Sequence, residues 1–494
     1  MNDKIARNKI LYEDDVEIAW KKLKENIITA AEEAIGKRKI NVNNKRRYTK
    51  PWFSEEVKSL ASKKRQIYIE YRNKTKTYEE YKLIRNEVNG KVRSIKENYW
   101  EKFSKDMEKD LYGGQKKVWT MLRNRKKPIN EYLQLPSISL QQWITHFKEL
   151  YDSDDQEIDL KFVDNEDEEV ATPIPIKLIQ ETIVKLKNRK SPGIDDISNE
   201  MIKYGGQPLI EEIYELFKKI YNPMVIPKDW RESIIIPIFK KGEKKDPKNY
   251  RGICLLNTIQ KLLTKIMAKE IIKLGISEEQ QGFRQNRSTI DAIFTLRQVA
   301  EKAIEYNKPA YLCFVDLKQA FDRIKVNDVV TILQKKGVKY NIIKIIKELN
   351  TNNSTRIKIN NQLTERIPIG TGIRQGDSLS PILFNVIMDE IIKETKKASM
   401  GYRLRKQDIK IICFADDVVL LAENEDNLQR LLYKFQLTAQ EFNMIISTEK
   451  TKSLTISRHP LRCKLAVYDR SIEQVMSFNY LGVKITSNKN LIEE

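Results

Sequence analysis

Three aspartates stand beside apolar runs in a pattern that suits chemistry with divalent cations. Asp416 and Asp417 separate the runs IICFA and VVLLA, and Asp316 lies near the end of the run AYLCFVDL. These runs have the length and composition of strands, so the simplest arrangement is a β-hairpin whose turn holds Asp416 and Asp417. Most Asp-Asp turns are only structural. Here the apolar flanks predict a hairpin inside a domain, where two carboxylates lose hydration and repel each other unless a cation binds.

A divalent metal ion is the natural partner of such carboxylates. Mg²⁺ prefers carboxylate oxygens, and Mn²⁺ is the alternative ion. If Asp316 joins Asp416 from a neighbouring strand, two ions about 3.5–4 Å apart would activate an attacking hydroxyl and stabilise a leaving oxygen in phosphoryl transfer. Zinc is not expected, because the chain has only two histidines and its four cysteines lack paired ligand spacing.

The charge of the chain is large and unevenly distributed. The net charge is +21, from 90 Lys and Arg against 69 Asp and Glu. Residues 1–130 hold 34 basic and 19 acidic residues, residues 131–180 hold 3 and 12, and residues 181–494 hold 53 and 38. Two basic segments therefore flank an acidic one. This distribution indicates a polyanionic partner, most simply a nucleic acid, rather than a uniformly solubilising surface.

Hydrophobic periodicity divides the chain into an all-helical part and a mixed part. Within residues 52–110, apolar residues recur every three or four positions from Ile84 to Tyr99, which predicts long helices with one apolar face. Residues 151–175 are acidic and end in two prolines, which predicts a solvated linker. From about residue 176, helical patterns alternate with short β-branched runs such as SIIIPIFK, which predicts a mixed α and β domain.

No segment predicts a secreted or membrane-bound protein. The longest apolar runs fall far short of the roughly 20 residues that span a membrane. The opening residues, MNDKIARNKILYEDD, are charged and do not resemble a signal segment. Three of the four cysteines lie in apolar stretches, which favours buried thiols in a reducing compartment. We therefore expect an intracellular location, in the nucleus or the cytoplasm, and no membrane partner.

The aspartates lie in sequence blocks that follow one another in a recognisable order. The three central blocks are FVDLKQAFD, GIRQGDSLSPILFN and FADD. Around them stand LKNRKSPGIDDISNEMIK, IIIPIFKKGEKKDPKNYRGICLLN, QQGFRQNRSTIDAI, NMIISTEKTKSL and FNYLGVKI. In this order the blocks resemble the motifs of reverse transcriptases, most closely those of non-LTR (LINE-type) retrotransposons. The resemblance covers about residues 186–485, and the basic helical region 40–130 is similar, less specifically, to the segment that precedes the polymerase in these elements.

The resemblance implies an α+β fold with the right-hand architecture of polymerases, preceded by an all-α basic region. The reverse transcriptase domain as a whole would span about residues 228–486. The expected divisions are a basic, helical, nucleic-acid-binding region over 1–130, an acidic linker over 131–180, fingers over 181–310, a palm with the primer grip over 311–486, and the truncated start of a thumb over 487–494. The thumb would thus be largely missing.

By the same resemblance, the aspartates and one lysine would form the catalytic centre. Asp316 and Asp416 would hold two Mg²⁺ ions, and Asp417 would be the third acid, nearer to the end of the primer. Lys450 is the candidate to protonate the leaving pyrophosphate, and Lys452 is its rival.

The resemblance also implies which residues bind the incoming nucleotide. Lys240 and Arg251 would bind its triphosphate. Phe321 would lie under its sugar, where an aromatic ring leaves no room for a 2′-hydroxyl and therefore favours deoxynucleotides. Gln375 would contact the new base pair, and Gly376 would let the backbone approach that pair closely.

The favoured function is RNA-directed DNA synthesis, in which dNTPs are added to a DNA primer or target on an RNA template. The alternative is a catalytically inactive RNA-binding remnant or a domesticated retroelement protein. The intact acids favour catalysis, whereas the missing thumb keeps the alternative open. A two-metal nuclease or transposase would explain the acids, but neither the RQG block nor Phe321. No segment resembles an endonuclease, a zinc knuckle or an RNase H.

Overall fold

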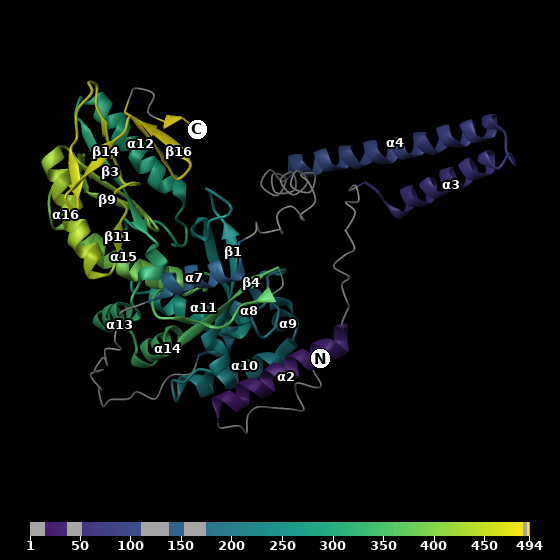
Figure 1. The fold of residues 1–494 in the computed structure, drawn as a ribbon, viewed down its shortest axis with the longest axis horizontal. Helices are drawn as coiled ribbons and strands as arrows, with labels where there is room; N and C mark the ends of the chain where they lie inside the picture. Colours follow the sequence, from purple (N-terminus) through teal and green to yellow (C-terminus); the bar gives the residue numbers. More distant parts are fainter. Residues whose placement is uncertain are drawn as a thin grey trace. The chain divides into compact units, whose positions relative to one another are not determined.

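Two compact units make up the chain, one of residues 1–37 with 136–494 and one of residues 38–135 (Figure 1). The computed structural model describes residues 15–36, 52–109, 138–152, 174–360, 362–487 and 492–493. Helices and sheets both occur, so the predicted α+β class is confirmed. Because the larger unit contains residues on both sides of the smaller one, the smaller unit is an insertion in the sequence of the larger.

The smaller unit contains a pair of long helices, as the periodicity predicted. Helix α3 spans Glu55–Arg72 and helix α4 spans Tyr78–Lys109. The two helices pack against each other, and their buried apolar residues are Val57, Ile67 and Val88. Tyrosines gather near the connecting turn, where Tyr71 stacks on Tyr81 with 5.6 Å between ring centroids.

The larger unit alternates helices and strands along the chain. Its α-helices in the described residues are α2 (Val16–Ile35), α7 (Leu140–Tyr151), α8 (Ile176–Val184), α9 (Asn199–Lys203), α10 (Gly206–Tyr221), α11 (Thr258–Ile272), α12 (Thr289–Glu305), α13 (Val326–Lys335), α14 (Tyr340–Asn350), α15 (Ser380–Lys396) and α16 (Glu425–Glu441). Its 3₁₀ turns are η1 (Lys228–Arg231), η2 (Pro247–Asn249) and η3 (Ala320–Arg323).

The strands of this unit form two large sheets and two small ones within the described residues. The strands are β1 (Glu232–Phe239), β2 (Tyr250–Leu255), β3 (Ala310–Lys318), β4 (Asn353–Ile359), β5 (Gln362–Leu363), β6 (Ile367–Ile369), β7 (Tyr402–Leu404), β8 (Gln407–Ile409), β9 (Ile411–Phe414), β10 (Asp417–Ala422), β11 (Ile445–Ile446), β12 (Lys452–Ile456), β13 (Leu465–Val467), β14 (Arg470–Gln474), β15 (Ser477–Tyr480), β16 (Val483–Thr486) and β17 (Ile492–Glu493).

The seven-stranded sheet has the order β13-β14-β12-β3-β10-β9, with β11 paired to β3. Its strand β3 is covered on both faces. Cys313 and Val315 face one core with α15 and α16, whereas Leu312 and Phe314 face a second core with α12. Figure 1 accordingly shows α12 and α16 on different sides of β3. Burial on both faces explains why the β3 sequence is a continuous apolar run rather than an alternating one.

The five-stranded sheet has the order β2-β1-β4-β5, with β6 paired to β4. Strands β1 and β2 form an antiparallel hairpin in which Ile238 pairs with Arg251, and β1 lies parallel to β4. The β-branched run that predicted a strand at residues 233–240 is β1. The hairpin connection is rich in exposed lysines, because the chain here leaves the sheet and enters solvent.

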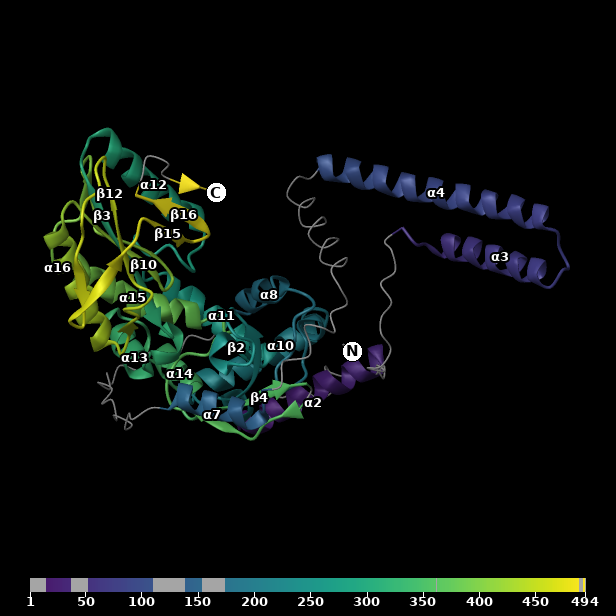
Figure 2. The same ribbon diagram turned by 45° about the horizontal axis from the view of Figure 1, so that its top comes forward.

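Helix α2 packs into the larger unit, although composition grouped it with the rest of residues 1–130. Trp20 meets Trp230 edge to face at 5.6 Å between ring centroids, and its Nε1 donates a hydrogen bond to Asp229 at 3.2 Å. Lys24 Nζ lies 2.8 Å from the same carboxylate. Figure 2 shows α2 beside α10. Averaged charge could not indicate this contact, since it depends on one buried face of a helix with charged residues on its other faces.

Helix α7 likewise lies within residues 131–180, the stretch that composition assigned to an acidic linker. Trp143 and Phe147 are buried, and Trp143 meets Tyr250 edge to face at 5.0 Å between ring centroids. The helix begins with a capping box formed by Ser139 and Gln142. Its apolar residues share one face, and averaging over a 50-residue acidic window hid that face.

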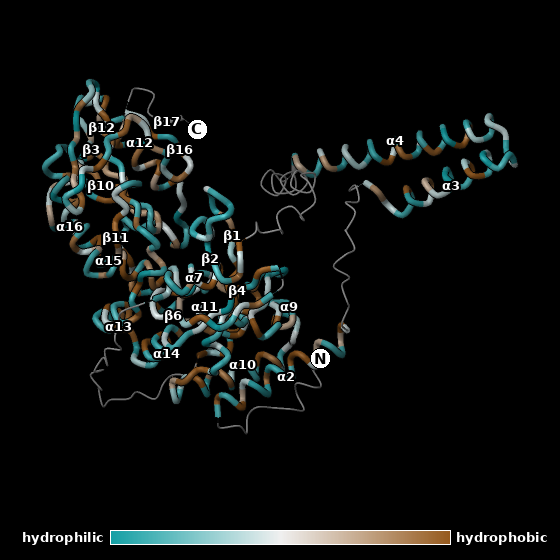
Figure 3. Tube along the Cα trace, in the orientation of Figure 1, coloured by the Kyte–Doolittle hydropathy of each residue, from teal (hydrophilic) through white to brown (hydrophobic). Residues whose placement is uncertain are grey.

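Apolar residues concentrate between the layers of the larger unit, whereas α3 and α4 show mixed polarity along their lengths (Figure 3). Among the residues that the structure describes, no helix combines the length and the apolarity needed to cross a lipid bilayer. All four cysteines are buried and unpaired, as the sequence predicted.

Candidate active site

The predicted aspartate hairpin is present, with a small change in its turn. Strands β9 and β10 pair in antiparallel fashion with Asp417 opposite Phe414, so the turn consists of Ala415 and Asp416. Asp417 is the first residue of β10 and pairs with Asp316 of β3. Asp316 therefore lies on β3, Asp417 lies on the adjacent strand β10, and Asp416 lies in the turn that connects β9 to β10. The sequence predicted this neighbouring-strand arrangement, but not that Asp417, rather than Asp416, pairs directly with Asp316.

A buried glutamine holds the turn of this hairpin in place. Gln280 Oε1 accepts hydrogen bonds from the amides of Ala415 and Gly282, both at 2.9 Å, and Gln280 Nε2 donates to the Ala415 carbonyl at 3.2 Å. Ala415 has a φ of 58°, a left-handed conformation that L-residues adopt only with support. A Cβ on Gly282 would lie 2.2 Å from the Ala415 nitrogen, so only glycine fits there. The QQG part of the upstream block therefore positions the acids, a role that the sequence analysis missed.

The carboxylates repel one another, which is the condition that a bound cation would relieve. The pKa of Asp417 is raised to about 6, first because protein displaces water around the carboxylate and then by the charges of Asp416 and Asp316. The Asp417 side chain still reaches solvent, so an ion has access to it.

Among the residues that the structure describes, no group of three or more His, Cys, Asp or Glu side chains, the three aspartates included, is placed so that it could hold a metal ion. This donor set nevertheless fits Mg²⁺, which is commonly bound by one or two carboxylates while water and substrate phosphates supply the remaining ligands.

Lys450 lies beside the first of these acids. Its Nζ is 3.4 Å from Asp316 Oδ2. The segment that carries Lys450 is anchored to β3, because the Ser447 amide donates to the Asp316 carbonyl at 2.8 Å and the Asp316 amide donates to the Thr451 hydroxyl at 3.2 Å. The lysine is exposed, so it could meet a substrate from the solvent side.

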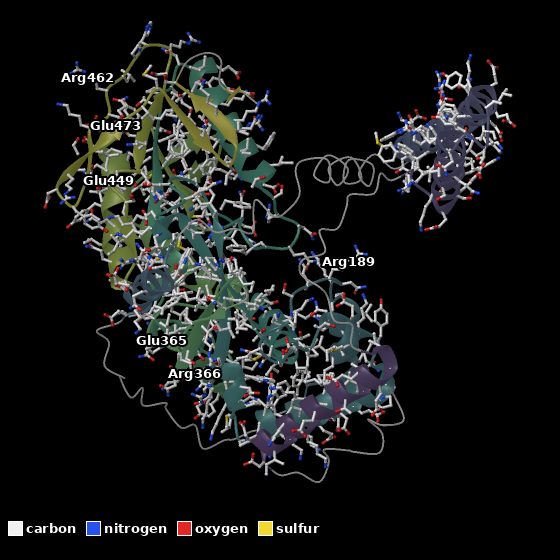
Figure 4. All side chains as sticks on the ribbon, turned by 45° about the vertical axis from the view of Figure 1, so that its right-hand side comes forward. Arg189, Glu365, Arg366, Glu449, Arg462 and Glu473 are labelled. Atoms are coloured by element: carbon white, nitrogen blue, oxygen red, sulfur yellow. The ribbon has the colours of Figure 1, made fainter. Side chains whose placement is uncertain are left out.

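The rival lysine has a different partner. Lys452 Nζ lies 2.6 Å from Glu473 Oε2, across the parallel pairing of β12 with β14. Glu473 is labelled in Figure 4. Of the two lysines, Lys450 is therefore the one that contacts an aspartate of the site.

Phe321 follows β3 in the turn η3, and two aromatic rings fix its orientation. It stacks on Phe384 of α15 with 4.5 Å between ring centroids and an interplanar angle of 10°. Phe283 meets it edge to face at 5.9 Å. Phe321 is partly exposed, so part of its side chain reaches solvent. Such packing makes the ring a rigid surface rather than a mobile side chain.

Gln375 and Gly376 lie in the loop that precedes α15, against strand β2. The Gln375 carbonyl accepts a hydrogen bond from the Cys254 amide at 2.7 Å. Gly376 has a φ of 120°, and a Cβ there would lie 2.5 Å from the Cys254 carbonyl oxygen. The glycine is thus required by a close approach of two backbones within the protein.

Lys240 directly follows β1 and Arg251 is the second residue of β2, so both lie near the β1–β2 connection, and both are exposed. The Lys240 amide donates to the Asn249 carbonyl at 2.9 Å, which extends the hairpin by one residue. The positive charge of Lys240 opposes the rise in the pKa of Asp417, so this lysine lies within electrostatic reach of the aspartates. The charge of Arg251 acts in the same way on Asp322.

Asp322 is a further acid of the site that the sequence analysis did not assign to a role. It lines a cavity of about 310 Å³ together with Gln319, Arg323, Lys248 and His146. Its carboxylate accepts hydrogen bonds from Gln375 Nε2 at 3.1 and 3.2 Å. The available signal was its place directly after Phe321 in the block FVDLKQAFD.

The comparisons with known families and proteins converge on one kind of enzyme. Residues 240–485 match the family described as reverse transcriptase (RNA-dependent DNA polymerase). The chain is 24% identical over 326 residues to the RNA-directed DNA polymerase from mobile element jockey of Drosophila melanogaster, which covers 63% of this chain and 35% of that protein. It is 26% identical over 255 residues to a retrovirus-related Pol polyprotein from the type-1 retrotransposable element R2 of Nasonia vitripennis, which covers 49% of this chain and 24% of that protein. The chain thus spans about a third of the first relative and about a quarter of the second.

Among solved structures, the chain is similar to telomerases. The apo telomerase of Candida tropicalis, truncated from its C-terminal domain, aligns with a TM-score of 0.40 and 14% sequence identity, over 60% of this chain and 67% of that one. The telomerase of Candida albicans in complex with a fragment of telomeric RNA aligns with a TM-score of 0.36 and 11% identity, over 53% of this chain and 45% of that one.

Proposed function

We propose that this chain, whose residues 240–485 are a reverse transcriptase domain of the non-LTR retrotransposon type, copies RNA into DNA by adding dNTPs to a primer 3′-hydroxyl. The observation that carries the proposal is the strand register that sets Asp417 opposite Asp316, with Asp416 in the adjoining turn. Primer extension on an RNA template with Mg²⁺ and dNTPs tests it, with the Asp416→Ala variant as the matched inactive chain.

The architecture supports a division into palm and fingers. In this proposal the seven-stranded sheet is the palm, and the five-stranded sheet is the fingers. Strands β4, β5 and β6 lie within residues 311–486 but pair with β1 or with each other, so the fingers include a segment that follows β3 in sequence. The boundary between the two parts is therefore crossed more than once by the chain.

The acids and Lys450 would divide the chemistry between them. Asp316, Asp416 and Asp417 would hold two Mg²⁺ or Mn²⁺ ions, which supply activation of the attacking hydroxyl and neutralise charge on the leaving oxygen. Lys450 carries its ammonium beside Asp316, and that position suits it to deliver a proton to the leaving pyrophosphate.

The remaining residues would bind and select the nucleotide. Lys240 and Arg251 are exposed cations near the β1–β2 connection, and Lys240 acts electrostatically on Asp417, so both suit the triphosphate. Gln375 would contact the new base pair. Gly376 would act indirectly. Its backbone lies close to that of Cys254, and this contact holds the Gln375 loop against β2.

Phe321 is proposed to exclude ribonucleotides by steric clash with the 2′-hydroxyl. We expect Phe321→Ala to lower the preference for dNTPs over NTPs by at least about tenfold, because the variant removes a repulsive contact that only the wrong sugar makes. Single-nucleotide insertion kinetics with dCTP and CTP opposite a template G measure this preference.

The matched control for this variant is Phe294→Ala, which truncates an exposed phenylalanine on α12 in the same unit. It should leave the sugar preference unchanged. Equal preferences in wild type and Phe321→Ala would show that Phe321 does not select the sugar.

The smaller unit is proposed to bind nucleic acid through its phosphates. Residues 38–135 hold 27 Lys and Arg against 12 Asp and Glu, so the excess positive charge of the N-terminal region lies in this unit rather than in α2. We expect replacement of residues 38–135 by a short Gly-Ser linker to weaken RNA binding. It should also lower the slope of log affinity against log salt by at least about 2, because each lost phosphate contact on single-stranded RNA contributes roughly 0.7.

Fluorescence anisotropy with labelled RNA, titrated at several salt concentrations, measures both quantities. The deletion leaves α2 in place, which matters because α2 packs into the larger unit. An unchanged affinity and slope would assign the smaller unit another role.

An RNA-binding remnant without catalysis is the second candidate. It predicts RNA binding by the chain with no extension above the Asp416→Ala background. The contacts among Gln280, Gly282 and Ala415 favour the catalytic function over the remnant. They hold the turn in a left-handed conformation that a site without function would not need.

A further inference from the structure

Two segments that would select the nucleotide are joined into one rigid assembly. The Ile373 amide donates to the Phe321 carbonyl at 3.0 Å, and the Gly372 amide donates to the Ile324 carbonyl at 3.0 Å. Gly372 has a φ of 89°, and a Cβ there would lie 2.8 Å from the backbone oxygen of Asp322. The turn that carries Phe321 and the loop that carries Gln375 therefore cannot move independently.

The side chain of Gln375 is fixed within this assembly by Asp322. Its Nε2 donates to both carboxylate oxygens, at 3.1 and 3.2 Å, while its backbone carbonyl is held by Cys254 of β2. An ionised carboxylate can only accept hydrogen bonds, so Asp322 requires the NH₂ end of the amide to face it. A neutral partner of similar shape would not dictate that orientation.

A charged Asp322 at this position lowers the stability of the fold. Burial raises its pKa to about 6, and Gln375, Arg251 and Arg323 only partly oppose that rise. A carboxyl group whose pKa is raised by folding destabilises the folded state above that pKa, including at pH 7 to 8. A residue chosen for stability alone would be neutral here, so the charge points to a role in function.

We propose that Asp322 is a positioning residue for nucleotide selection, which orients the Gln375 amide toward the base pair formed by the incoming nucleotide. One N–H of the amide is committed to the carboxylate. The second N–H and Oε1 remain available for the minor-groove edge of that pair, where acceptors predominate. The inference rests on the proposed function, because it requires Gln375 to contact the nucleotide.

The test is single-nucleotide insertion by the full chain on an RNA template, with matched and mismatched dNTPs. Asp322→Ala should raise KM for the matched dNTP about tenfold and lower discrimination against the mismatch to a similar extent, as loss of a charge-assisted hydrogen bond would. Because Asp322 contacts no reacting atom, kcat should change by less than about threefold. Asp322→Asn keeps one acceptor oxygen and should lie between wild type and Asp322→Ala.

A double-mutant cycle separates positioning from a merely structural role. In a Gln375→Ala background, Asp322→Ala should produce no further change in KM or discrimination. The melting temperature of Asp322→Asn at pH 7.5 should equal or exceed that of wild type, since the variant removes a buried charge. Asp426→Asn, an exposed acid at the start of α16, is the charge-matched control and should behave as wild type.

Each contrary outcome identifies what fails. If Asp322→Ala changes nothing, or changes both backgrounds equally, the positioning role is overturned while primer extension stands. If Gln375→Ala itself behaves as wild type in an active chain, the role of Gln375 and this inference are overturned together. A wild-type chain that extends no primer overturns the proposed function, and the inference with it.

Discussion

The Asp416→Ala variant should incorporate dNTPs at least about 1000-fold more slowly than wild type, a loss of about 4 kcal/mol of transition-state stabilisation. Asp416 lies in the turn between β9 and β10, beside the pair formed by Asp417 and Asp316. Removal of this carboxylate would weaken the hold of the proposed site on the Mg²⁺ ions that would activate the attacking hydroxyl. Primer extension on an RNA template, with single-turnover rates at saturating dNTP, measures the loss.

Two controls make this result specific. Asp426→Ala removes an exposed acid of the same unit, and its extension rate should match that of wild type. RNA affinity of Asp416→Ala should also remain close to that of wild type, because the carboxylate repels phosphates rather than binding them. If wild type extends no faster than Asp416→Ala while both bind RNA, the chain is not a polymerase in this form and the RNA-binding remnant is supported.

The Asp389→Ala variant should lower the free energy of unfolding of the larger unit by on the order of 3 kcal/mol. Asp389 lies on α15 with only 1% of its side chain exposed, and it joins three elements. Its Oδ1 accepts from the Ser277 amide at 2.8 Å and hydroxyl at 2.6 Å, and its Oδ2 lies 2.7 Å from Lys336 Nζ and 2.8 Å from Lys393 Nζ. Truncation would leave these donors without their shared buried acceptor.

Urea denaturation followed by near-ultraviolet circular dichroism measures this loss. The matched control is Glu390→Gln on the same helix, which also removes a contact with Lys336 and Lys393 but is more exposed. It should cost less than about 1 kcal/mol. A loss for Asp389→Ala that is no larger than that of Glu390→Gln would show that the buried cluster contributes little.

The same cluster predicts a direction for the pH dependence of stability. Lys336, Lys393 and Ser277 lower the pKa of Asp389 to about 2, although burial alone would raise it. A carboxyl group with a lowered folded-state pKa stabilises the fold above its unfolded pKa of about 3.9, and that contribution is lost as pH falls toward 2. Wild type should therefore lose its stability advantage over Asp389→Ala progressively between about pH 4 and pH 2.

The sequence pointed to the three proposed catalytic aspartates more directly than to the elements that hold them. Asp316, Asp416 and Asp417 could be singled out as candidates because carboxylates beside apolar strands are costly to bury unless a cation binds. Gln280 could not, since a glutamine in a loop has no distinctive pattern until its two bonds to Ala415 are seen. Long-range pairing is set by tertiary contacts that local periodicity does not encode.

The boundaries of the two units could not be predicted from composition either. Charge averaged over residues 1–130 and 131–180 concealed the apolar faces of α2 and α7, because charged and polar residues occupy the other faces of both helices. Both faces repeat every three or four residues and could have been found by a local search for amphipathic helices. Which surface each face would cover could not be predicted from that pattern, because Trp20 and Trp143 meet partners far away in sequence.

The contact between α2 and the segment of Trp230 affects the order in which parts of the chain can fold during synthesis. Trp20 and Asp229 are 209 residues apart, and the smaller unit lies between them in sequence. A ribosome that adds 5–20 residues per second needs roughly 10–40 s to make that interval. During this time α2 exposes the face that Trp20 occupies, while α3 and α4 can already form. The most basic part of the chain is thus synthesised, and can meet nearby RNA, before the aspartates of the proposed active site exist.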